Sequence, residues 1–303
     1  MKKYITGIAI VISSCIFTGC GAQSPVADGN EENMTQVSES DMTADEENMT
    51  QMSETEMETK IETEIETGTG IESQEELLTD SVDQSRIDEV GTLANEHHEI
   101  YGETNPDTLL GEANFNWLVV DDSFAGAETI NTYLYEAEVA SAWSVFEDDV
   151  RADEEAISEF DMSYSYDSDV SYIRYFDGTY MSFVQENYEY FGGAHGMPFW
   201  NGYTFNLETG ERLLLMDILS DTEDELKDIV TNYFGEMIDE SPEDYWADAK
   251  ETVHDTVSLE TTDFVLTDEG ICFYMYPYSI AAYVMGFPDV TIPYSEFNMK
   301  ILN

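Results

Sequence analysis

The chain has 303 residues, of which 66 are acidic and 10 are basic, so its formal net charge is −56. A charge of this size argues against nucleic-acid phosphates and anionic lipid as ligands, because both would be repelled. Three cysteines are too few for a disulfide scaffold. The length allows two domains of about 100–200 residues only if the whole chain folds. The aromatic residues indicate that it does not, because 35 of the 38 lie in residues 106–303.

The first twenty residues have the pattern of a bacterial lipoprotein signal. Two lysines precede an apolar stretch of about 14 residues (4–17), which is shorter than the roughly 20 residues of a spanning helix. The stretch ends in Phe17-Thr18-Gly19-Cys20, which resembles a lipoprotein box. We therefore expect a signal peptide over residues 1–19 and a lipid on Cys20, which anchors an extracytoplasmic protein to the outer face of the cytoplasmic membrane. The alternative is an ordinary secretory signal followed by an incidental cysteine.

Residues 20–105 have the composition of an acidic, disordered tether. They contain 24 acidic residues, two basic ones and a single aromatic, Tyr101, so they cannot bury enough apolar surface to offset the entropy of ordering the chain. The segment also repeats itself, since residues 32–39 (ENMTQVSE) return as residues 47–54 (ENMTQMSE). A random coil of this length spans roughly 50 Å, and charge repulsion extends it further. Some helix is expected within residues 71–100.

The aromatic-rich remainder begins with strands and one helix. Residues 116–121 are expected to form a strand, and residues 127–150 an amphipathic helix. The helix prediction depends on apolar side chains near helical spacing, which are Ile130, Leu134, Ala137, Ala140, Trp143 and Phe146. Alternating apolar and polar residues then predict strands at 160–166, 170–176, 179–190 and 199–207. Asp177-Gly178 is a strong signal for the hairpin turn between the second and third of these.

A second helical region and three further strands are predicted towards the C-terminus. One helix is expected over residues 221–238, opened by the cap-forming cluster Asp221-Thr222-Glu223-Asp224, and another over residues 245–254. The strands are expected at 264–267, 271–276 and 289–294. Strands in runs with inserted helices predict an α+β fold with a mainly antiparallel sheet. We expect two small subdomains, at residues 106–195 and 196–303.

Five motifs follow one another in the second half of the chain. They are residues 191–196 (FGGAHG), 203–213 (YTFNLETGERL), 264–271 (FVLTDEGI), 277–286 (PYSIAAYVMG) and 292–294 (IPY). With these motifs the chain resembles, over roughly residues 110–300, the extracellular module of RsiV-type anti-sigma factors, which also occurs beside some bacterial peptidoglycan deacetylases. The resemblance implies a non-catalytic α+β module at the cell surface, which in the RsiV branch receives lysozyme. It carries over no residue-level binding site.

The chain departs from the RsiV-type proteins at its N-terminus. Those proteins carry a cytoplasmic sigma-binding segment and a transmembrane helix before the module, whereas here the module follows a lipoprotein-type signal. We therefore do not expect this chain to signal across the membrane by itself.

Residues near the glycine-rich motif are the candidates for a site. His195 lies between glycines that permit close backbone approach, so its imidazole is a candidate base or ligand contact. The alternative is a strand connection in which His195 packs or hydrogen-bonds locally. Four tyrosines could stack on glycan rings or anchor a protein partner, and core packing is the alternative for them. These tyrosines are Tyr188, Tyr190, Tyr276 and Tyr278.

Other chemistry finds little support in the sequence. His97-His98-Glu99 lacks the spacing of a zinc-protease helix, and the acidic clusters lack the glycine and terminal glutamate of a calcium loop. The sequence contains no phosphate loop, dinucleotide fingerprint or Gly-x-Ser-x-Gly elbow. We expect no metal site, no cofactor and no catalytic residue. Cys272, in an apolar strand, is expected to be a buried thiol.

The expected function is therefore binding and not catalysis. Residues 106–303 hold 42 acidic and six basic side chains, a net charge of −36, which would steer a cationic protein towards them. We expect a cell-wall-related partner, with lysozyme first and peptidoglycan glycan second. The alternatives are a cell-wall hydrolase or esterase that uses His195, and a structural partner of another surface protein.

Overall fold

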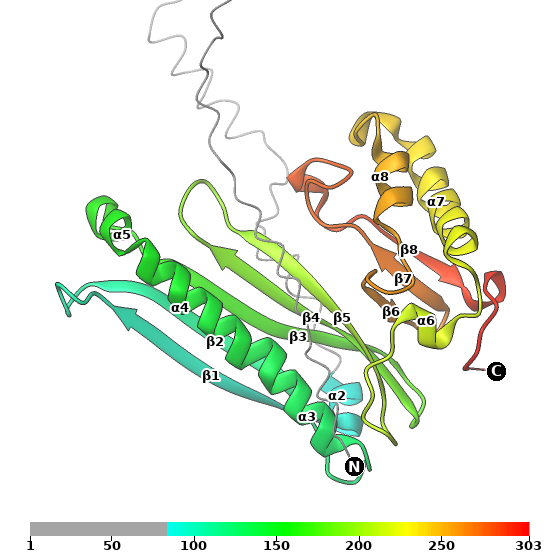
Figure 1. The fold of residues 1–303 in the computed structure, drawn as a ribbon, viewed down its shortest axis with the longest axis horizontal. Coiled ribbons are helices and arrows are strands. Elements are labelled where there is room, and N and C mark those ends of the chain that lie inside the picture. Colours follow the sequence, from blue (N-terminus) through cyan, green and yellow to red (C-terminus); the bar gives the residue numbers. More distant parts are fainter. Residues whose placement is uncertain (1–83, 303) are drawn as a thin grey trace, which may run out of the picture. The chain divides into compact units, whose positions relative to one another are not determined.

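Two β-sheets, each accompanied by helices, form the fold in the computed structural model, which describes residues 84–302 (Figure 1). The larger sheet has the order β1-β2-β3-β4-β5, and the smaller has the order β6-β7-β8. All neighbouring strands pair antiparallel except β2 and β3, which are parallel. The prediction of an α+β fold with mainly antiparallel sheet and inserted helices is confirmed. The predicted signal peptide, Cys20 and residues 21–83 lie outside the described residues.

The larger sheet contains the longest strands of the fold. Its strands are β1 (Gly91–Tyr101), β2 (Leu109–Val120), β3 (Tyr164–Phe176), β4 (Tyr180–Tyr190) and β5 (Met197–Asn206). The predicted hairpin turn joins β3 to β4. Gly178 adopts a φ of +86°, and an Asp177 carboxylate oxygen accepts hydrogen bonds from the next backbone amides, Thr179 N at 2.8 Å and Tyr180 N at 2.7 Å.

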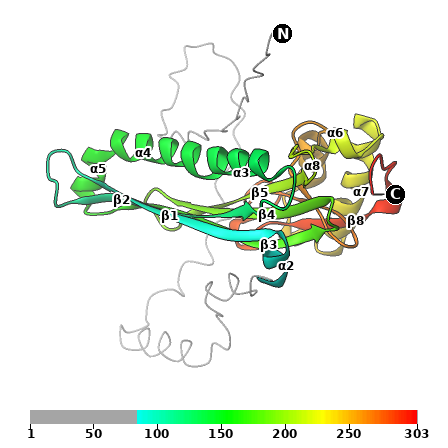
Figure 2. The same cartoon turned by 90° about the horizontal axis from the view of Figure 1, so that it is seen from below.

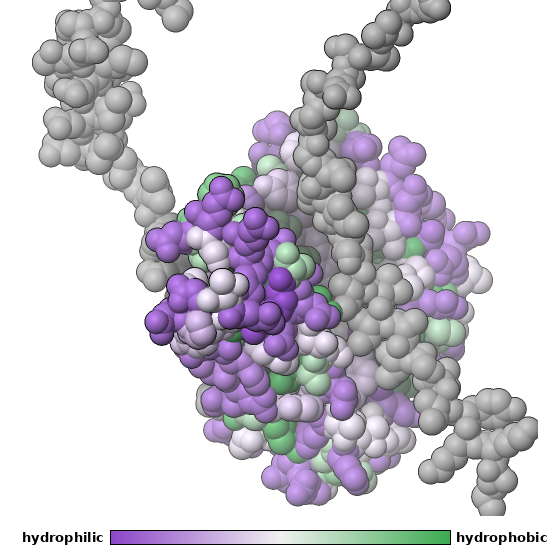
Figure 3. Space-filling model, turned by 60° about the vertical axis from the view of Figure 1, so that its left-hand side comes forward, coloured by the Kyte–Doolittle hydropathy of each residue, from purple (hydrophilic) through white to green (hydrophobic). Residues whose placement is uncertain are grey.

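Helices cover both faces of this sheet, but unequally. On one face lie α3 (Ala127–Tyr135), a π-helical segment (Glu136–Ser141), α4 (Ala142–Ala152) and α5 (Glu154–Phe160). On the opposite face lies the short helix α2 (Gln84–Val90), under β3 (Figure 2). The face of the molecule seen in Figure 3 is mostly hydrophilic, with apolar residues scattered among polar ones.

The second sheet is formed by shorter strands and carries its own helices. In chain order this part contains α6 (Leu215–Ile218), α7 (Glu223–Glu240), a 3-10 turn (Pro242–Asp244), α8 (Ala249–Thr256), β6 (Phe264–Leu266), β7 (Gly270–Tyr274), a 3-10 turn (Tyr283–Met285), β8 (Asp289–Pro293) and a last 3-10 turn (Tyr294–Glu296). The predicted cap of α7 is confirmed. Thr222 Oγ1 accepts from Glu225 N, and the Glu225 carboxylate accepts from Thr222 N at 2.8 Å. None of the helices in residues 84–302 is sufficiently long and apolar to span a membrane.

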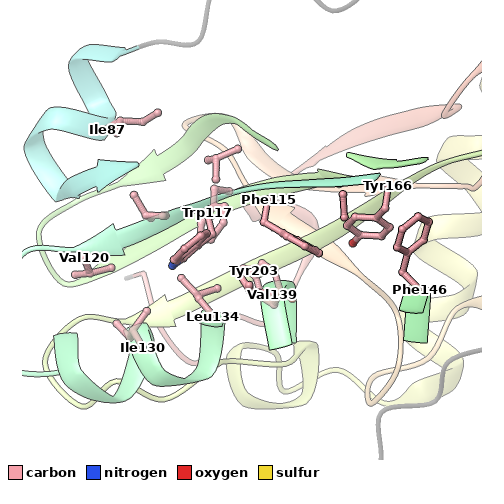
Figure 4. Packing of buried hydrophobic residues seen from close by; sticks show 14 of the residues in the cluster. Ile87, Phe115, Trp117, Val120, Ile130, Leu134, Val139, Phe146, Tyr166 and Tyr203 are labelled. Carbon is pink, nitrogen blue, oxygen red and sulfur yellow. The ribbon is translucent and has the colours of Figure 1, made fainter. Parts of the chain in front are cut away.

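Each sheet has its own buried apolar cluster. In the first, Ile130, Leu134 and Phe146 from α3 and α4 pack against β2 and its neighbours, and Ile87 of α2 closes the cluster from the other side (Figure 4). The second is formed by α7, α8 and the inner faces of β6, β7 and β8. A small third cluster of Val184, Val265 and Cys272 connects the sheets. Cys272 is a buried free thiol, as predicted, and burial raises its pKa to about 12.

The helix predicted over residues 127–150 is present but interrupted. The π-helical segment inserts one extra residue per turn, which rotates the following side chains relative to an ideal α-helix. A regular helix with 3.6 residues per turn would bury Ala137 and Ala140. In the structure Glu138 and Val139 are buried, and Ala137 and Ala140 are only partly buried. Helical periodicity alone cannot predict such an insertion.

The N-terminal boundary of the folded part differs from the prediction. Residues 84–101 form α2 and β1, although the sequence assigns them to the tether over residues 20–105. The sequence of β1 is mostly polar because β1 is an edge strand with one face exposed to solvent. Ile100 of β1 and Ile87 and Val90 of α2 are buried in the first cluster, and Leu93 and Ala94 of β1 are partly buried against it.

Two further boundaries are corrected. The division expected between residues 195 and 196 falls inside the β4–β5 hairpin, because β5 pairs with β4 along its whole length. The two sheets therefore divide after Asn206. Residues 160–163 are not in a strand, since α5 ends at Phe160 and Asp161 adopts a left-handed conformation that terminates it. Residues 164–176 then form one bulged strand in place of two.

Candidate functional site

Two stretches of the chain contain no charged residue, and they meet in space. They are residues 190–207 and residues 270–288, both rich in aromatic side chains. The rest of the folded part is densely acidic, and acidic residues stand immediately outside each stretch at Glu189, Glu208, Glu269 and Asp289. The first stretch supplies the β4–β5 loop and β5. The second supplies β7 and the long connection from β7 to β8.

Tyrosine hydroxyl groups of β4 hold the glycine-rich loop 191–196. The Tyr190 hydroxyl donates to the carbonyl oxygen of Gly193 at 3.1 Å, and the Tyr188 hydroxyl accepts from the Gly196 amide at 2.9 Å. Gly192 and Gly193 adopt φ values of +83° and +93°, which glycine tolerates best. A side chain at Gly196 would overlap the Tyr188 ring and the β4 backbone. The loop is therefore a defined structure, set by its own residues.

His195 is exposed but has both ring nitrogens engaged. Its Nδ1 lies 2.9 Å from the carbonyl oxygen of Gly196, and its Nε2 lies 3.3 Å from the hydroxyl of Tyr278. A carbonyl oxygen only accepts, so Nδ1 carries a hydrogen, and in the neutral ring Nε2 then accepts from Tyr278. The imidazole also stacks on the ring of Tyr283, with centroids 4.1 Å apart, and the Tyr283 hydroxyl donates to Gly196 O at 3.1 Å.

Tyr278 has the most unusual backbone in this region. Its φ is +67°, a conformation that is rare for a residue with a side chain and that clusters at functional sites. Its side chain is 49% exposed. Its carbonyl oxygen accepts from Nε1 of Trp246 at 3.4 Å, and Trp246 is 45% exposed. The connection between the 3-10 turn Pro242–Asp244 and α8 thus places Trp246 beside the backbone of Tyr278.

We define the aromatic surface as Tyr188, His195, Trp246, Tyr278 and Tyr283. Three of the five side chains predicted for binding belong to it, namely Tyr188, His195 and Tyr278. Tyr190 contributes from beneath by fixing the loop. The exposed apolar side chains of Val284 and Met285, on the 3-10 turn that follows, extend the same connection.

Tyr276, the fifth predicted residue, lies beside the aromatic surface in a different environment. Its hydroxyl donates to Trp200 O at 2.9 Å and to an Asp263 carboxylate oxygen at 3.0 Å. Burial raises the pKa of both Tyr276 and Asp263, and the adjacent Arg212 opposes the shift on Asp263. The Tyr276 hydroxyl therefore joins the two sheets, although the residue itself is 37% exposed.

A buried polar network stands behind Tyr276, and the sequence gives no direct signal for it. Arg212 contacts Asp263 at 3.4 Å, donates to the Tyr133 hydroxyl at 2.9 Å and lies over the Tyr203 ring at 4.9 Å. The Tyr203 hydroxyl in turn donates to the carboxylate of Glu138, and Asn201 donates to it at 3.1 Å. Burial raises the pKa of Glu138. A buried glutamate on a π-helical segment could be suspected from neither composition nor periodicity.

The hydrogen-bond partners of His195 differ from those of a typical catalytic histidine. Both nitrogens of His195 are held by a carbonyl oxygen and a phenol, not by the carboxylate partner that orients a catalytic histidine. No group of three or more histidine, cysteine or carboxylate side chains is arranged for a metal ion within residues 84–302. His97 and His98, considered for metal binding, lie in β1, where His98 stacks on Trp143 at 4.5 Å.

The family match covers the second sheet, and the matches to solved structures extend over a larger part of the chain. Residues 213–295 match the model of a family described as "Protein of unknown function (DUF3298)". No curated protein matches the chain. Among solved structures, a DUF3298 family member from Bacteroides fragilis has 19% identity and a TM-score of 0.48, and covers 68% of this chain and 92% of that one. A DUF3298 family protein from Pseudomonas aeruginosa has 20% identity and a TM-score of 0.47, covering 68% and 90%.

The resemblance to RsiV-type modules finds no counterpart among these matches, and it stays a prediction from the five motifs. The matched residues run from the strand-to-helix connection before α6 to the 3-10 turn after β8, and they include Trp246, Tyr278 and Tyr283. Over residues 213–295 the chain is therefore similar to a protein family of unknown function, DUF3298.

Proposed function

We propose that this chain is a non-catalytic binding protein of the cell surface, lipid-anchored through Cys20, whose aromatic surface captures a cationic, cell-wall-related protein such as lysozyme. The observation that carries the proposal is the meeting of two uncharged, aromatic stretches on a module with a net charge of −36. Exposed rings fixed by hydrogen bonds are effective anchors, because little side-chain entropy is lost when a partner covers them.

Electrostatics supports this choice of partner. An acidic module accelerates encounter with a basic protein, whereas an uncharged aromatic contact area avoids burying unpaired carboxylates. The negative charge and the aromatic contact area act at different stages of binding. Long-range attraction brings the partner close, and the rings provide the contact that persists when salt screens the attraction.

Peptidoglycan glycan is the second candidate ligand, since the exposed rings of Tyr188, Trp246 and Tyr278 could stack on sugar rings. The engagement of both His195 nitrogens favours binding over a hydrolase or esterase that uses this residue. A role as structural partner of another surface protein would use the same rings with a different occupant.

The test is a calorimetric titration of the mature chain (residues 20–303) with a cationic lysozyme at low and at physiological salt. We expect saturable one-site binding that weakens with salt but persists at physiological ionic strength. The Tyr278→Leu variant should bind about ten-fold more weakly, corresponding to about 1.4 kcal/mol.

Tyr101→Leu is the matched control, because Tyr101 is 42% exposed but lies in β1, at the opposite edge of the larger sheet. This variant should bind as the unmodified chain does. Heat that vanishes at physiological salt, or equal weakening by both variants, would refute capture through the aromatic surface. Binding of soluble peptidoglycan fragments in place of lysozyme would select the second candidate.

A further inference from the structure

The tyrosines of the aromatic surface have their hydroxyl groups engaged within the protein. Those of Tyr188 and Tyr283 bond to the backbone of Gly196, and that of Tyr278 bonds to His195. A sugar-binding site needs polar groups free to orient the hydroxyl groups of its ligand. With the hydroxyl groups engaged, the two most exposed members, Tyr278 and Trp246, offer a partner mainly their rings, and ring faces attract cations through their quadrupoles.

The charges that flank the rings have the sign that a cationic side chain requires. Glu243 and Asp244 are exposed and stand just before Tyr245 and Trp246 in the chain. The surface therefore combines ring faces for stacking with carboxylates at its margin.

We propose that the aromatic surface binds the guanidinium group of an arginine side chain on a basic partner, with the rings of Tyr278 and Trp246 as its main contacts. This inference rests on the proposed function and names the chemical group that is recognised. Guanidinium is planar, weakly hydrated and able to stack on a ring while it donates in its own plane to a carboxylate. The ammonium group of lysine is compact and strongly hydrated, so it gains less from the same surface.

The fold already stabilises its own arginines in this manner. Arg174 lies 4.7 Å from the Tyr172 ring centroid and 5.3 Å from that of Trp200. Arg212 lies 4.9 Å from the Tyr203 ring and 5.9 Å from the Tyr133 ring, with Asp263 as its carboxylate partner. Both cases combine an arginine with two rings, which is the arrangement that we assign to Tyr278, Trp246 and an incoming side chain.

The test compares hexa-arginine with hexa-lysine as probes for the mature chain (residues 20–303). Both peptides carry the same charge, so the attraction of the acidic module cancels in the ratio of their affinities. We expect hexa-arginine to bind roughly two- to five-fold more tightly, the effect of one added ring contact. That preference should disappear in Tyr278→Leu and in Trp246→Leu, and it should survive in Tyr101→Leu.

Tyr278→Phe keeps the ring but removes the hydrogen bond to His195, so it should retain the preference for arginine. Equal affinity for the two peptides, or a preference that survives both leucine variants, would overturn the proposal. So would loss of the preference in Tyr278→Phe with the fold intact by circular dichroism, since the hydroxyl would then be the contact.

The outcomes also separate this inference from the proposed function. An arginine preference that depends on Tyr278, without any binding of lysozyme, would support recognition of arginine side chains and exclude lysozyme as the partner. Lysozyme binding that is unaffected by Tyr278→Leu and Trp246→Leu would show that the aromatic surface is not the binding site and that lysozyme binds to another face of the protein.

Discussion

At the scale of single residues, the fold tolerates several carboxyl groups in places where charge is costly. Glu138 is fully buried and is held by Tyr203 and Asn201. Glu189, at the end of β4, is packed on the helix side of the larger sheet near Asp149. Burial, and secondly the Asp149 carboxylate, raise its pKa to about 7. Such groups couple stability to pH.

Glu189 should make the protein less stable as the pH rises towards neutrality. Its folded-state pKa lies above the unfolded value of about 4.3, so the folded state holds the proton more tightly. The cost of the charged form is absent below about pH 4, grows between pH 4 and 7, and is complete above pH 7. Glu189→Gln should therefore be more stable than the unmodified chain at pH 8, by about 1–3 kcal/mol, and no different at pH 4.

Urea unfolding from pH 4 to pH 8 measures this difference. Glu208→Gln, in the exposed turn after β5, is the control and should leave the curve unchanged. A constant difference between Glu189→Gln and the unmodified chain at every pH would show that packing, not titration, is responsible.

At the scale of elements, the sheets meet where β5 crosses β6. Gly202 lies against the backbone of Phe264, and a Cβ there would overlap its carbonyl oxygen. Leu266 N donates to Ser182 Oγ at 2.9 Å, which ties β6 to β4. Because β7 pairs with β6, this contact also positions the connection that follows β7.

Gly202→Ala should destabilise the chain by about 2–4 kcal/mol, because backbone on both sides must move to admit the methyl group. Gly193→Ala is the comparison. No atom lies within 4 Å of its would-be Cβ, so only the cost of its positive φ remains, about 1–2 kcal/mol. Thermal unfolding of the two variants should rank Gly202→Ala clearly below Gly193→Ala, and the reverse order would contradict the close crossing.

Comparing the predicted with the observed secondary structure shows which elements a local sequence pattern can predict. β4, β5, β7, β8 and α7 lie close to their predicted positions, because alternation, turn residues and a capping box are local signals. The π-helical insertion and the polar edge strand β1 were not predictable in this way. Each depends on what the segment packs against, which in these cases is β5 and β2.

At the scale of the whole molecule, the N-terminal boundary has the largest consequence for experiments. A chain that begins at residue 106, where the composition changes, would lack α2 and β1. It would lose the buried side chains of Ile87, Val90 and Ile100, and it would leave the edge of β2 unpaired.

We expect a chain of residues 106–303 to be unfolded or aggregated, and a chain of residues 84–303 to unfold cooperatively. Loss of three buried apolar side chains, at about 2–5 kcal/mol each, is comparable to a typical total stability of about 5–15 kcal/mol. Circular dichroism melting and size-exclusion chromatography of the two chains measure the difference. A cooperative transition at the same temperature in both would show that α2 and β1 contribute nothing to the fold.

From the sequence alone one could predict the α+β class, a mainly antiparallel sheet, the position of most elements and three members of the aromatic surface. These follow from periodicity, turn chemistry and the exclusion of charge, all of which can be seen along the chain. The contact between Tyr278 and His195, the engagement of the Tyr276 hydroxyl by Trp200 and Asp263, and the burial of Glu138 could be learned from the tertiary structure alone. The reason is physical: contacts between residues 83 positions apart depend on how the two sheets pack, and no local pattern encodes that packing.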